Sequence, residues 1–498
     1  MCAVVALKMN RPVYGFLSRS DDMMITGKRH EVFSKYRVGF DAQGKIKGIH
    51  YHAWLNGGWS KDHSEGVTMV MGVMIDSVYN IPNLHFTGYP VKTNTCSNTA
   101  FRGYGNPQGT LVNEGVMRRI AFEVGKEVEV VKRLNFALEG DRRFMGGKIH
   151  SDALIECWDY CYKWSDFELR KQEIKDFNKK STTIKRGIAM SSVRFSLPHA
   201  GPTAHGIASL LINLDGSVQL SIGGTEMGQG LNQKMLQVCS EALRRPIQSI
   251  TIVDSSTDKV TNAPETGGSQ NADTNGLAVL VCCKRILSKL QPFIDKNSGD
   301  WHKAIREAFA NFVPLQCTEY GIVERSKYGV DETETPYNTT GACAVIMEID
   351  ILTGYNKIIG VDMVMDLGES LNPALDIGQI EGAFMQGYGL VTCEKISFDP
   401  TTGKLDQNSS GKYKIPKAED VPNDFRVKLL GANKVYGAQV YSSKGVGEPP
   451  LMMSCGAVNS AIMNCVDSWR RENGLVDFVE TVSPLTADKI RAMCPIRV

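Results

Sequence analysis

The residues that decide the fold class lie at 207–245 and read IASLLINLDGSVQLSIGGTEMGQGLNQKMLQVCSEALRR. Two runs of mostly apolar residues flank Asp215-Gly216, a dipeptide that favours the tight turn of a β-hairpin. A glycine-rich segment follows, and apolar residues then recur at helical spacing at Leu231, Met235, Val238 and Ala242. The stretch therefore predicts a hairpin, a glycine-rich loop and an amphipathic helix in direct succession.

The same parts recur along the whole chain. Further hairpins are predicted at 34–53, 343–368 and 394–406. Glycine-rich segments lead into predicted helices within 102–125, 266–287, 376–390 and 445–469. The charged segment 165–186 is typical of a solvated helix followed by a basic connector, and we expect a boundary between two lobes just before it. The sequence thus predicts an α+β fold, with mostly antiparallel hairpins and helices packed on them.

The composition is that of an ordinary folded protein. The chain has 498 residues, of which 42% are hydrophobic and 22% charged, and its formal net charge is +2. It is long enough for more than one hydrophobic core. The balanced charge gives no sign of nucleic-acid binding, and no apolar run reaches the length of about 18 residues that a membrane span needs. The start of the chain lacks the features of a secretory signal, so we expect a cytoplasmic protein with neither nucleic acid nor membrane as a partner.

Cysteine and histidine spacing gives no sign of a protein-ligated metal. The 13 cysteines are odd in number and contain no C-x-x-C pair, so we expect reduced thiols, mostly in the core, and no iron–sulfur cluster within this chain. His50 and His52 alternate along one predicted strand. No group of His, Cys and Asp has the spacing of metal ligands, so we expect no metal bound directly by side chains.

One carboxylate stands in an unusual setting near the C-terminal end. In SSKGVGEPPL, residues 442–451, Glu448 is enclosed by Gly445 and Gly447 on one side and by Pro449 and Pro450 on the other. A solvated glutamate needs no such surroundings. Either the backbone turns sharply here for structural reasons, or the side chain is held for chemistry.

Three other glycine-rich loops carry candidate residues, because a helix N-terminus approached through glycines can bind an anion. In GGTEMGQG, Gln229 would project from the start of a helix, unless it only caps a plain turn. In SNTAFRGYGNPQG, Arg102 could be an anion clamp or form a structural salt bridge. In DIGQIEGAFMQGYG, the spacing of Gly378 and Gly382 is typical of close helix packing, which leaves Gln379 as the functional candidate. None of these loops is a mononucleotide-binding or Rossmann motif.

Taken together, SNTAFRGYGNPQG, GGTEMGQG, SLNPALDIGQIEGAFMQGYG and SSKGVGEPPL resemble the molybdenum-cofactor region of the xanthine dehydrogenase and aldehyde oxidase family, the molybdenum hydroxylases. The similarity runs, with breaks, from about Arg11 to Cys494, and the motifs occur in family order. It implies two molybdopterin-binding subdomains, for which we take 1–150 and 151–498, with the cofactor between them, and a homodimer. In this family the pterin sulfurs hold the molybdenum, and Arg102 and Gly268 would lie nearest the metal.

The resemblance also implies roles for individual residues. Glu448 would be the catalytic base that takes a proton from a metal-bound hydroxyl, during hydroxylation of an aldehyde or N-heterocycle with oxygen derived from water. Its apolar neighbours would raise the pKa of its carboxyl group by disfavouring the charged form. The residues implied in cofactor binding are Arg102, Met227, Gly228, Gln229, Gly267, Gly268, Ser269 and Gln379. Those implied at the substrate are Val70, Tyr104, Phe195 and Ser196, although Phe195 taken alone reads as core packing.

Two departures from the family pattern bear on function. Xanthine-type members carry an arginine eleven residues before the position of Ile81, and Val70 stands there in this chain, as an apolar residue does in aldehyde-oxidase-type members. We therefore expect aldehydes or apolar heterocycles rather than purines, with xanthine-type oxidation as an alternative. The family's G-G-x-G-x-K segment and its [2Fe–2S] and FAD domains are not found in this sequence. We expect a truncated chain, a subunit whose electron-transfer domains are separate, or an inactive member that acts as an interaction protein.

Overall fold

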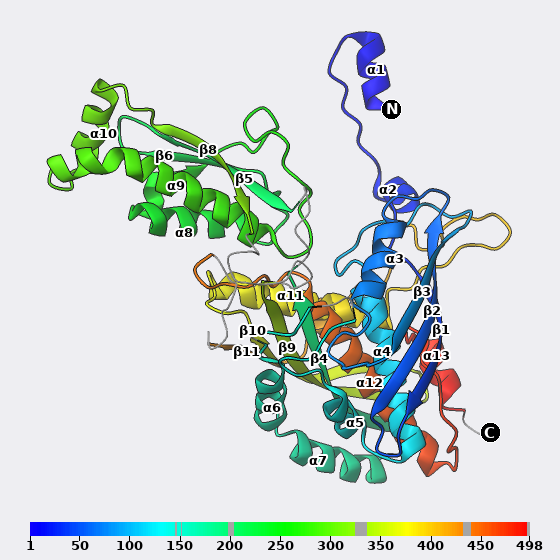
Figure 1. Ribbon diagram of the computed structural model, residues 1–498. Coiled ribbons are helices and arrows are strands. Elements are labelled where there is room, and N and C mark those ends of the chain that lie inside the picture. Colours follow the sequence, from blue (N-terminus) through cyan, green and yellow to red (C-terminus); the bar gives the residue numbers. More distant parts are fainter. Residues whose placement is uncertain (145–146, 151, 198–203, 324–335, 432–439, 496–498) are drawn as a thin grey trace.

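The computed structural model of the chain describes residues 1–144, 147–150, 152–197, 204–323, 336–431 and 440–495. Its helices and strands are arranged around three sheets (Figure 1), which confirms the predicted α+β class. In each sheet one edge strand pairs in parallel and the other pairs are antiparallel. In the part of the chain that the structure describes, no helix is both long and apolar enough to cross a membrane.

The first sheet has the strand order β1-β2-β3, and its β1–β2 pair is the hairpin predicted at 34–53. Side chains alternate between the two faces of the sheet, as the two-residue period of a strand requires. The inner face of β2, with Ile49, Tyr51 and Ala53, belongs to a core shared with α3 and α4. The elements of this part are α1 (Cys2–Met9), α2 (Arg19–Ile25), β1 (Val32–Phe40), β2 (Ile46–Gly58), α3 (Ser64–Val73), β3 (Leu84–Lys92), α4 (Asn106–Val124) and α5 (Val128–Asn135).

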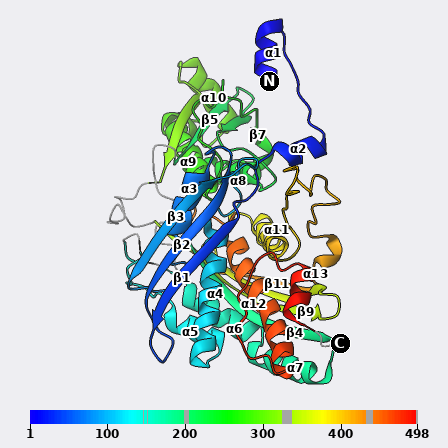
Figure 2. The ribbon, with the colours of Figure 1, turned by 90° about the vertical axis from the view of Figure 1, so that its right-hand side faces the viewer.

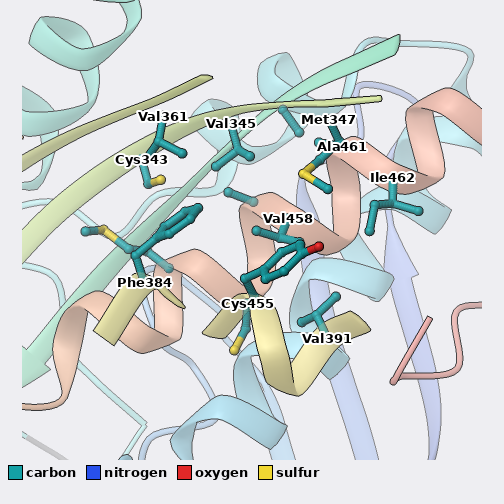
Figure 3. Close-up of a cluster of buried hydrophobic side chains, with 14 of the residues drawn as sticks. Cys343, Val345, Met347, Val361, Phe384, Val391, Cys455, Val458, Ala461 and Ile462 are labelled. Carbon is teal, nitrogen blue, oxygen red and sulfur yellow. The ribbon is translucent and has the colours of Figure 1, made fainter. Parts of the chain in front are cut away.

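The second sheet, with the order β11-β10-β9-β4, contains the hairpin predicted at 343–368 as β9 and β10. One face of the sheet packs on α11 and α12. Figure 3 shows Val345 and Met347 of β9 above Val458 of α12. The elements here are α6 (Leu154–Trp164), α7 (Phe167–Lys180), β4 (Ile184–Ser196), β9 (Asn338–Asp350), β10 (Asn356–Asp366), α11 (Pro373–Thr392), a 3-10 turn at Ala418–Asp420, β11 (Asp424–Leu430), α12 (Pro449–Glu472) and α13 (Ala487–Met493).

Helix α12 is buried along most of its length. It lies between β4 and α4, and Gly456 allows the close contact, because a Cβ there would lie 2.4 Å from the Ser191 Oγ. This packing fixes the N-terminus of α12, and therefore Glu448, relative to the second sheet.

The third sheet, with the order β7-β6-β5-β8, forms a lobe of its own with α8, α9 and α10 (green in Figure 1). The hairpin predicted at 207–224 is β5 with β6. An ion pair of 2.5 Å between Lys234 of α8 and Asp376 of α11 joins the lobe to the second sheet. The elements are β5 (His205–Ile212), β6 (Val218–Ile222), α8 (Leu231–Leu243), a 3-10 turn at Ile247–Ser249, β7 (Ile250–Ile252), α9 (Asn271–Lys296), α10 (Trp301–Ala310) and β8 (Gln316–Ile322).

The hairpin predicted at 394–406 is wrong. Its segment contains only an isolated bridge between Phe398 and Leu405, and no extended strand. A two-stranded ribbon is marginal in water unless its apolar face packs on something, and this segment offers few apolar residues for that purpose. All 13 cysteines are free thiols, as predicted. The division into subdomains at 1–150 and 151–498 stays a prediction.

Candidate active site

Four segments that are far apart in the sequence meet at Glu448. The Gly103 N–H donates to Oε1 of Glu448 at 2.9 Å, and the Ser269 hydroxyl donates to Oε2 at 3.0 Å. The Arg102 Nε donates to the Gly447 carbonyl at 2.6 Å. Arg102 also reaches Gln379 on α11. The loops before α4 and α9 therefore reach the carboxylate that precedes α12, and α11 is joined to them through Arg102.

The glycines around Glu448 allow this close approach. A Cβ at Gly445 would lie 1.9 Å from the Ser269 carbonyl oxygen, and one at Gly447 would lie 3.0 Å from the Ser269 Oγ. The Glu448 N–H donates to the Ser269 Oγ at 2.9 Å. Two prolines then open α12, where their fixed φ suits the first turn of a helix. Glu448 is the N-cap residue of α12 but does not cap it with its side chain, so the carboxylate is left for groups from other segments.

The turn before α4 aims a backbone donor at Glu448. Gly103, Tyr104 and Gly105 all have positive φ, of 95°, 43° and 97°. Such a run requires glycine at its two outer positions. The Tyr104 hydroxyl hydrogen-bonds with Nδ1 of His63 at 2.8 Å, and a Cβ at Gly66 would lie 2.4 Å from that hydroxyl. The turn is thereby tied to the first turn of α3.

Arg102 binds neutral partners. Its Nη2 donates to the Gln379 carbonyl at 3.3 Å and to Oε1 of Gln379 at 3.1 Å, and its Nη1 donates to Oε1 of Gln386 at 3.1 Å. No ion pair between Arg102 and a carboxylate occurs within the described ranges, so the structural salt bridge is not found there. Burial lowers the pKa of the Arg102 guanidinium, and the charge of Glu448 opposes that effect.

Gln386 was missed by the sequence analysis. It lies seven residues after Gln379, which places both on one face of α11, so helical spacing was the available signal. The predicted packing role of Gly378 and Gly382 is wrong, since a Cβ at either position meets no described atom within 4 Å. Gly387 makes the close contact with α12 instead, because a Cβ there would lie 2.8 Å from the Ser454 Cβ.

Arg29 is a second missed residue. Its guanidinium carbon lies 4.7 Å from the centre of the Phe101 ring, a cation–π contact. Its Nη1 is buried and has no hydrogen-bond partner among the described residues. Burial lowers the pKa of Arg29, while the nearby Glu394 and Glu448 carboxylates raise it. Nothing in the local sequence TGKRHEV distinguishes this arginine from a surface residue.

Electrostatics leave Glu448 closer to neutrality than an ordinary glutamate. Burial raises the pKa of its carboxyl group. The Gly103 N–H, the Ser269 hydroxyl and the charges of Arg102 and Arg29 favour the ionised form, but they offset only part of the effect. A carboxylate with a raised pKa and oriented donors can accept a proton near neutral pH.

The GGTEMGQG loop is closed on itself. The Glu226 carboxylate accepts hydrogen bonds from the N–H groups of Gly228 at 2.9 Å, Gly230 at 3.0 Å and Asn232 at 2.9 Å. The Gln229 side chain accepts from the Met227 N–H at 2.7 Å and donates to the Thr225 carbonyl at 2.8 Å. The structure therefore does not bring Met227, Gly228 or Gln229 into a described contact with Glu448.

The loop before α9 lies between these two regions. Thr225 donates from its N–H to the Thr266 hydroxyl at 2.9 Å, and Gly267 donates to Oδ1 of Asn271 at 3.1 Å. Gly268 has a φ of 65° and leads directly into Ser269, which binds Glu448. The loop 266–269 thus links GGTEMGQG to the carboxylate.

The predicted substrate residues lie on α3, in the turn before α4 and on β4. Val70 lies on α3, half-buried. Phe195 on β4 is 6% exposed and belongs to the core that also contains Leu451, so it packs in the core as its sequence suggested. The Ser196 hydroxyl donates to Oδ1 of Asn338 at 2.8 Å and accepts from Arg143.

Known proteins are similar to this chain in both sequence and fold. Family models described as molybdopterin cofactor-binding domains match residues 1–136 and 160–422. The probable aldehyde oxidase gad-3 of Caenorhabditis elegans is 77% identical over 99% of this chain and 39% of that protein. The xanthine dehydrogenase/oxidase of Gallus gallus is 41% identical over 99% of this chain and 36% of that protein.

Solved structures agree on the fold. The aldehyde oxidoreductase from Desulfovibrio desulfuricans superposes with a TM-score of 0.84 and 24% identity, over 99% of this chain and 52% of that one. The CO dehydrogenase from Oligotropha carboxidovorans superposes with a TM-score of 0.85 and 19% identity, over 99% of this chain and 64% of that one. The chain spans less than two fifths of the length of the curated relatives named above.

Proposed function

The chain belongs to the molybdopterin cofactor-binding family of the molybdenum hydroxylases, and we propose that it forms the cofactor and substrate site of an aldehyde-oxidising member. The observation that carries the proposal is the Glu448 carboxylate, held by the Gly103 N–H and the Ser269 hydroxyl where four segments meet. Its raised pKa suits a general base.

The residues around Glu448 fit an anionic pterin cofactor. The buried Nη1 of Arg29 has no acceptor among the described residues, and Arg102 carries a second guanidinium charge. A Cβ at Gly228 or at Gly267 would meet no described atom within 4 Å, so both positions leave space next to the backbone. We propose that Arg102, Met227, Gly228, Gln229, Gly267, Gly268, Ser269 and Gln379 hold the cofactor.

The fit at the GGTEMGQG loop rests on the Gln229 side chain and not on the loop amides. Those amides already bind Glu226. An anion could displace Glu226 only by breaking three hydrogen bonds and bringing two negative charges together. Gln229 can instead turn its amide away from Thr225 and Met227 at lower cost.

The cofactor supplies the redox chemistry of hydroxylation when it is bound. Glu448 accepts the proton that the transferred, water-derived oxygen loses. The Gly103 N–H and the Ser269 hydroxyl fix the two carboxylate oxygens, so the base meets that proton in one orientation. Arg102 holds the Gly447 carbonyl and thereby the backbone that carries Glu448.

For the substrate, we propose an aromatic aldehyde or an apolar heterocycle bound among Val70, Tyr104, Phe195 and Ser196. The 40% identity to an aldehyde oxidase and the 41% identity to a xanthine dehydrogenase/oxidase do not separate the two activities, whereas the 77% identity to a probable aldehyde oxidase favours the first. Val70 favours the first, because it cannot donate to a purine oxygen. Loss of a hydrogen bond from a charged group costs about 1.5–3 kcal/mol, or roughly 10- to 100-fold in turnover of the purine.

We further propose that electrons leave through [2Fe–2S] and FAD centres carried by other segments, and that the protein is a cytoplasmic homodimer with the subdomain boundary near residue 150.

Metal and pterin analysis of the purified protein tests the cofactor. Turnover of benzaldehyde and xanthine with an artificial electron acceptor tests the substrate class. A protein without molybdenum would instead support the inactive interaction protein, and efficient xanthine turnover would overturn the assignment based on Val70.

A further inference from the structure

The outer face of the first sheet carries a groove that the proposed function does not use. Its volume is about 780 Å³, and it lies where β1, β2 and β3 meet the 142–144 segment. Figure 2 shows these three strands side by side in front of the rest of the molecule. Its lining includes Arg37, His50, His85, Arg142, Arg143 and Phe144.

Among the described residues, the lining is basic and contains no Asp or Glu. Strand register places Arg37, His50 and His85 in one row across β1, β2 and β3. Adjacent strands lie about 4.8 Å apart, so the three side chains are close neighbours on the same face. Desolvation and the neighbouring His52, His85 and Arg37 lower the pKa of the His50 imidazole, and Arg37 supplies a permanent positive charge to this row.

Two arginines of the groove are free to bind a ligand. Within the described residues, Arg37 and Arg142 form no ion pair, and both side chains are exposed. The nearby acids are already engaged, since Asp41 pairs with Lys47 and Asp76 with Arg143.

The groove also offers flat surfaces. The rings of His50 and His85 are stacked with their centroids 4.4 Å apart, and Phe144 is 38% exposed. A planar heterocycle of any kind can stack on such rings.

We propose that this groove binds a small phosphate-bearing anion of nucleotide size. Guanidinium groups match the geometry of phosphate oxygens with two parallel hydrogen bonds, and Arg37 and Arg142 supply two such groups. The volume falls within the range of about 300–1,000 Å³ that is typical of small-molecule sites. The formal net charge of +2 argues for a small anion rather than a nucleic acid. The proposal is independent of the proposed function, because the groove does not include Glu448.

Isothermal titration calorimetry of the full chain with adenosine diphosphate and with inorganic pyrophosphate tests this proposal. The variants are Arg37→Ala, Arg142→Ala and the double variant. Each substitution removes a charge-assisted contact from an exposed side chain, so each is expected to weaken binding about 10-fold without affecting folding. Arg143 is left unchanged because its guanidinium also donates to Ser196. Added salt should weaken binding further, because it screens exposed charges.

Lys35→Ala is the matched control. Lys35 lies two residues before Arg37 on the same face of β1 but outside the lining, and opposite His52. Binding of either probe that is lost in the double variant and kept in Lys35→Ala supports a built site. Absence of saturable binding up to about 1 mM overturns the proposal, as does an equal loss in Lys35→Ala, which would indicate only diffuse attraction by surface charge.

Discussion

Glu226 and Glu448 both lie among glycines at the start of a helix, and their carboxylates have different kinds of partner. Glu226 binds the N–H groups of its own loop, at Gly228, Gly230 and Asn232. Glu448 binds Gly103 and Ser269, which come from segments far away in the sequence. Burial raises the pKa of both groups, but the backbone donors leave that of Glu226 lowered, whereas that of Glu448 stays raised.

The contrast is the one expected between a structural carboxylate and the general base that we propose. A carboxylate at a helix N-terminus that binds its own loop stabilises that helix in its ionised form. A carboxylate that is desolvated and held by distant segments is kept at a cost in stability, as is common at functional sites. The glycines near Glu226 form the loop that closes on its carboxylate. Those near Glu448 let the segment of Ser269 come close.

The largest expected effect is on turnover by Glu448→Gln. If Glu448 is the base, aldehyde oxidation per bound molybdenum atom should fall by ~10²- to 10⁴-fold, because the amide cannot accept the proton. Glu381→Gln, an exposed glutamate on α11, is the matched control and should leave turnover unchanged. If Glu448→Gln turns over nearly as fast as this control, Glu448 is not the base, and its difference from Glu226 has no catalytic meaning.

The stability of Glu448→Gln provides a check on folding. A carboxyl group whose pKa is raised in the folded state contributes stability at low pH, and that contribution is lost as the pH rises through the folded pKa. Above the folded pKa the ionised glutamate therefore costs stability that a neutral glutamine does not, and the variant should unfold at a temperature no lower than that of the native chain. A clear drop in unfolding temperature would mean that lost activity reflects lost structure.

A smaller effect is expected at the other glutamate. Glu226→Gln replaces two acceptor oxygens with one and removes the negative charge at the N-terminus of α8, so we expect a loss of about 1 kcal/mol, limited by solvent screening at this exposed site. The lowered pKa of Glu226 means that its contribution is present above the unfolded pKa and is lost as the pH falls through the folded pKa. Urea unfolding at pH 7 and below about pH 4 measures the difference in unfolding free energy between the native chain and Glu226→Gln. This difference should vanish at the lower pH. A difference that grows on acidification would contradict the capping role.

Local sequence patterns predicted most of the fold. The hairpins at 34–53, 207–224 and 343–368 carry alternating apolar residues and tight turns, and each forms as expected. Local patterns could not show that each sheet gains a parallel edge strand, because that pairing joins segments distant in sequence, such as β10 with β11. The false hairpin at 394–406 had the turn residues but no packed face to support it.

The site was predictable where a residue sits in a distinctive motif. Arg102, Ser269, Gln379 and Glu448 come from four glycine-rich segments, and the structure brings all four together. Arg29 could not be found in this way, because its burial beside Phe101 is created by tertiary packing. Nor could the sequence show that Glu226, rather than a ligand, binds the amides of GGTEMGQG.

The smallest expected effect, on Ser269→Ala, tests whether the distant donors tune Glu448. The Ser269 hydroxyl donates to Oε2 of Glu448 and favours its ionised form. Without it the pKa of Glu448 should rise further, so the acid limb of the pH profile of kcat/KM should move to higher pH. Turnover at pH 7 should fall by roughly 10-fold or less, the worth of one hydrogen bond, and largely recover above the shifted limb. Thr266→Ala removes a hydroxyl from the same loop that binds Thr225 and not Glu448, and it should leave the limb in place. A pH-independent loss of turnover in Ser269→Ala would mean that the serine only shapes the loop. An acid limb that moves equally in both variants would mean that the loop itself, and not the Ser269 hydroxyl, sets the pKa of Glu448.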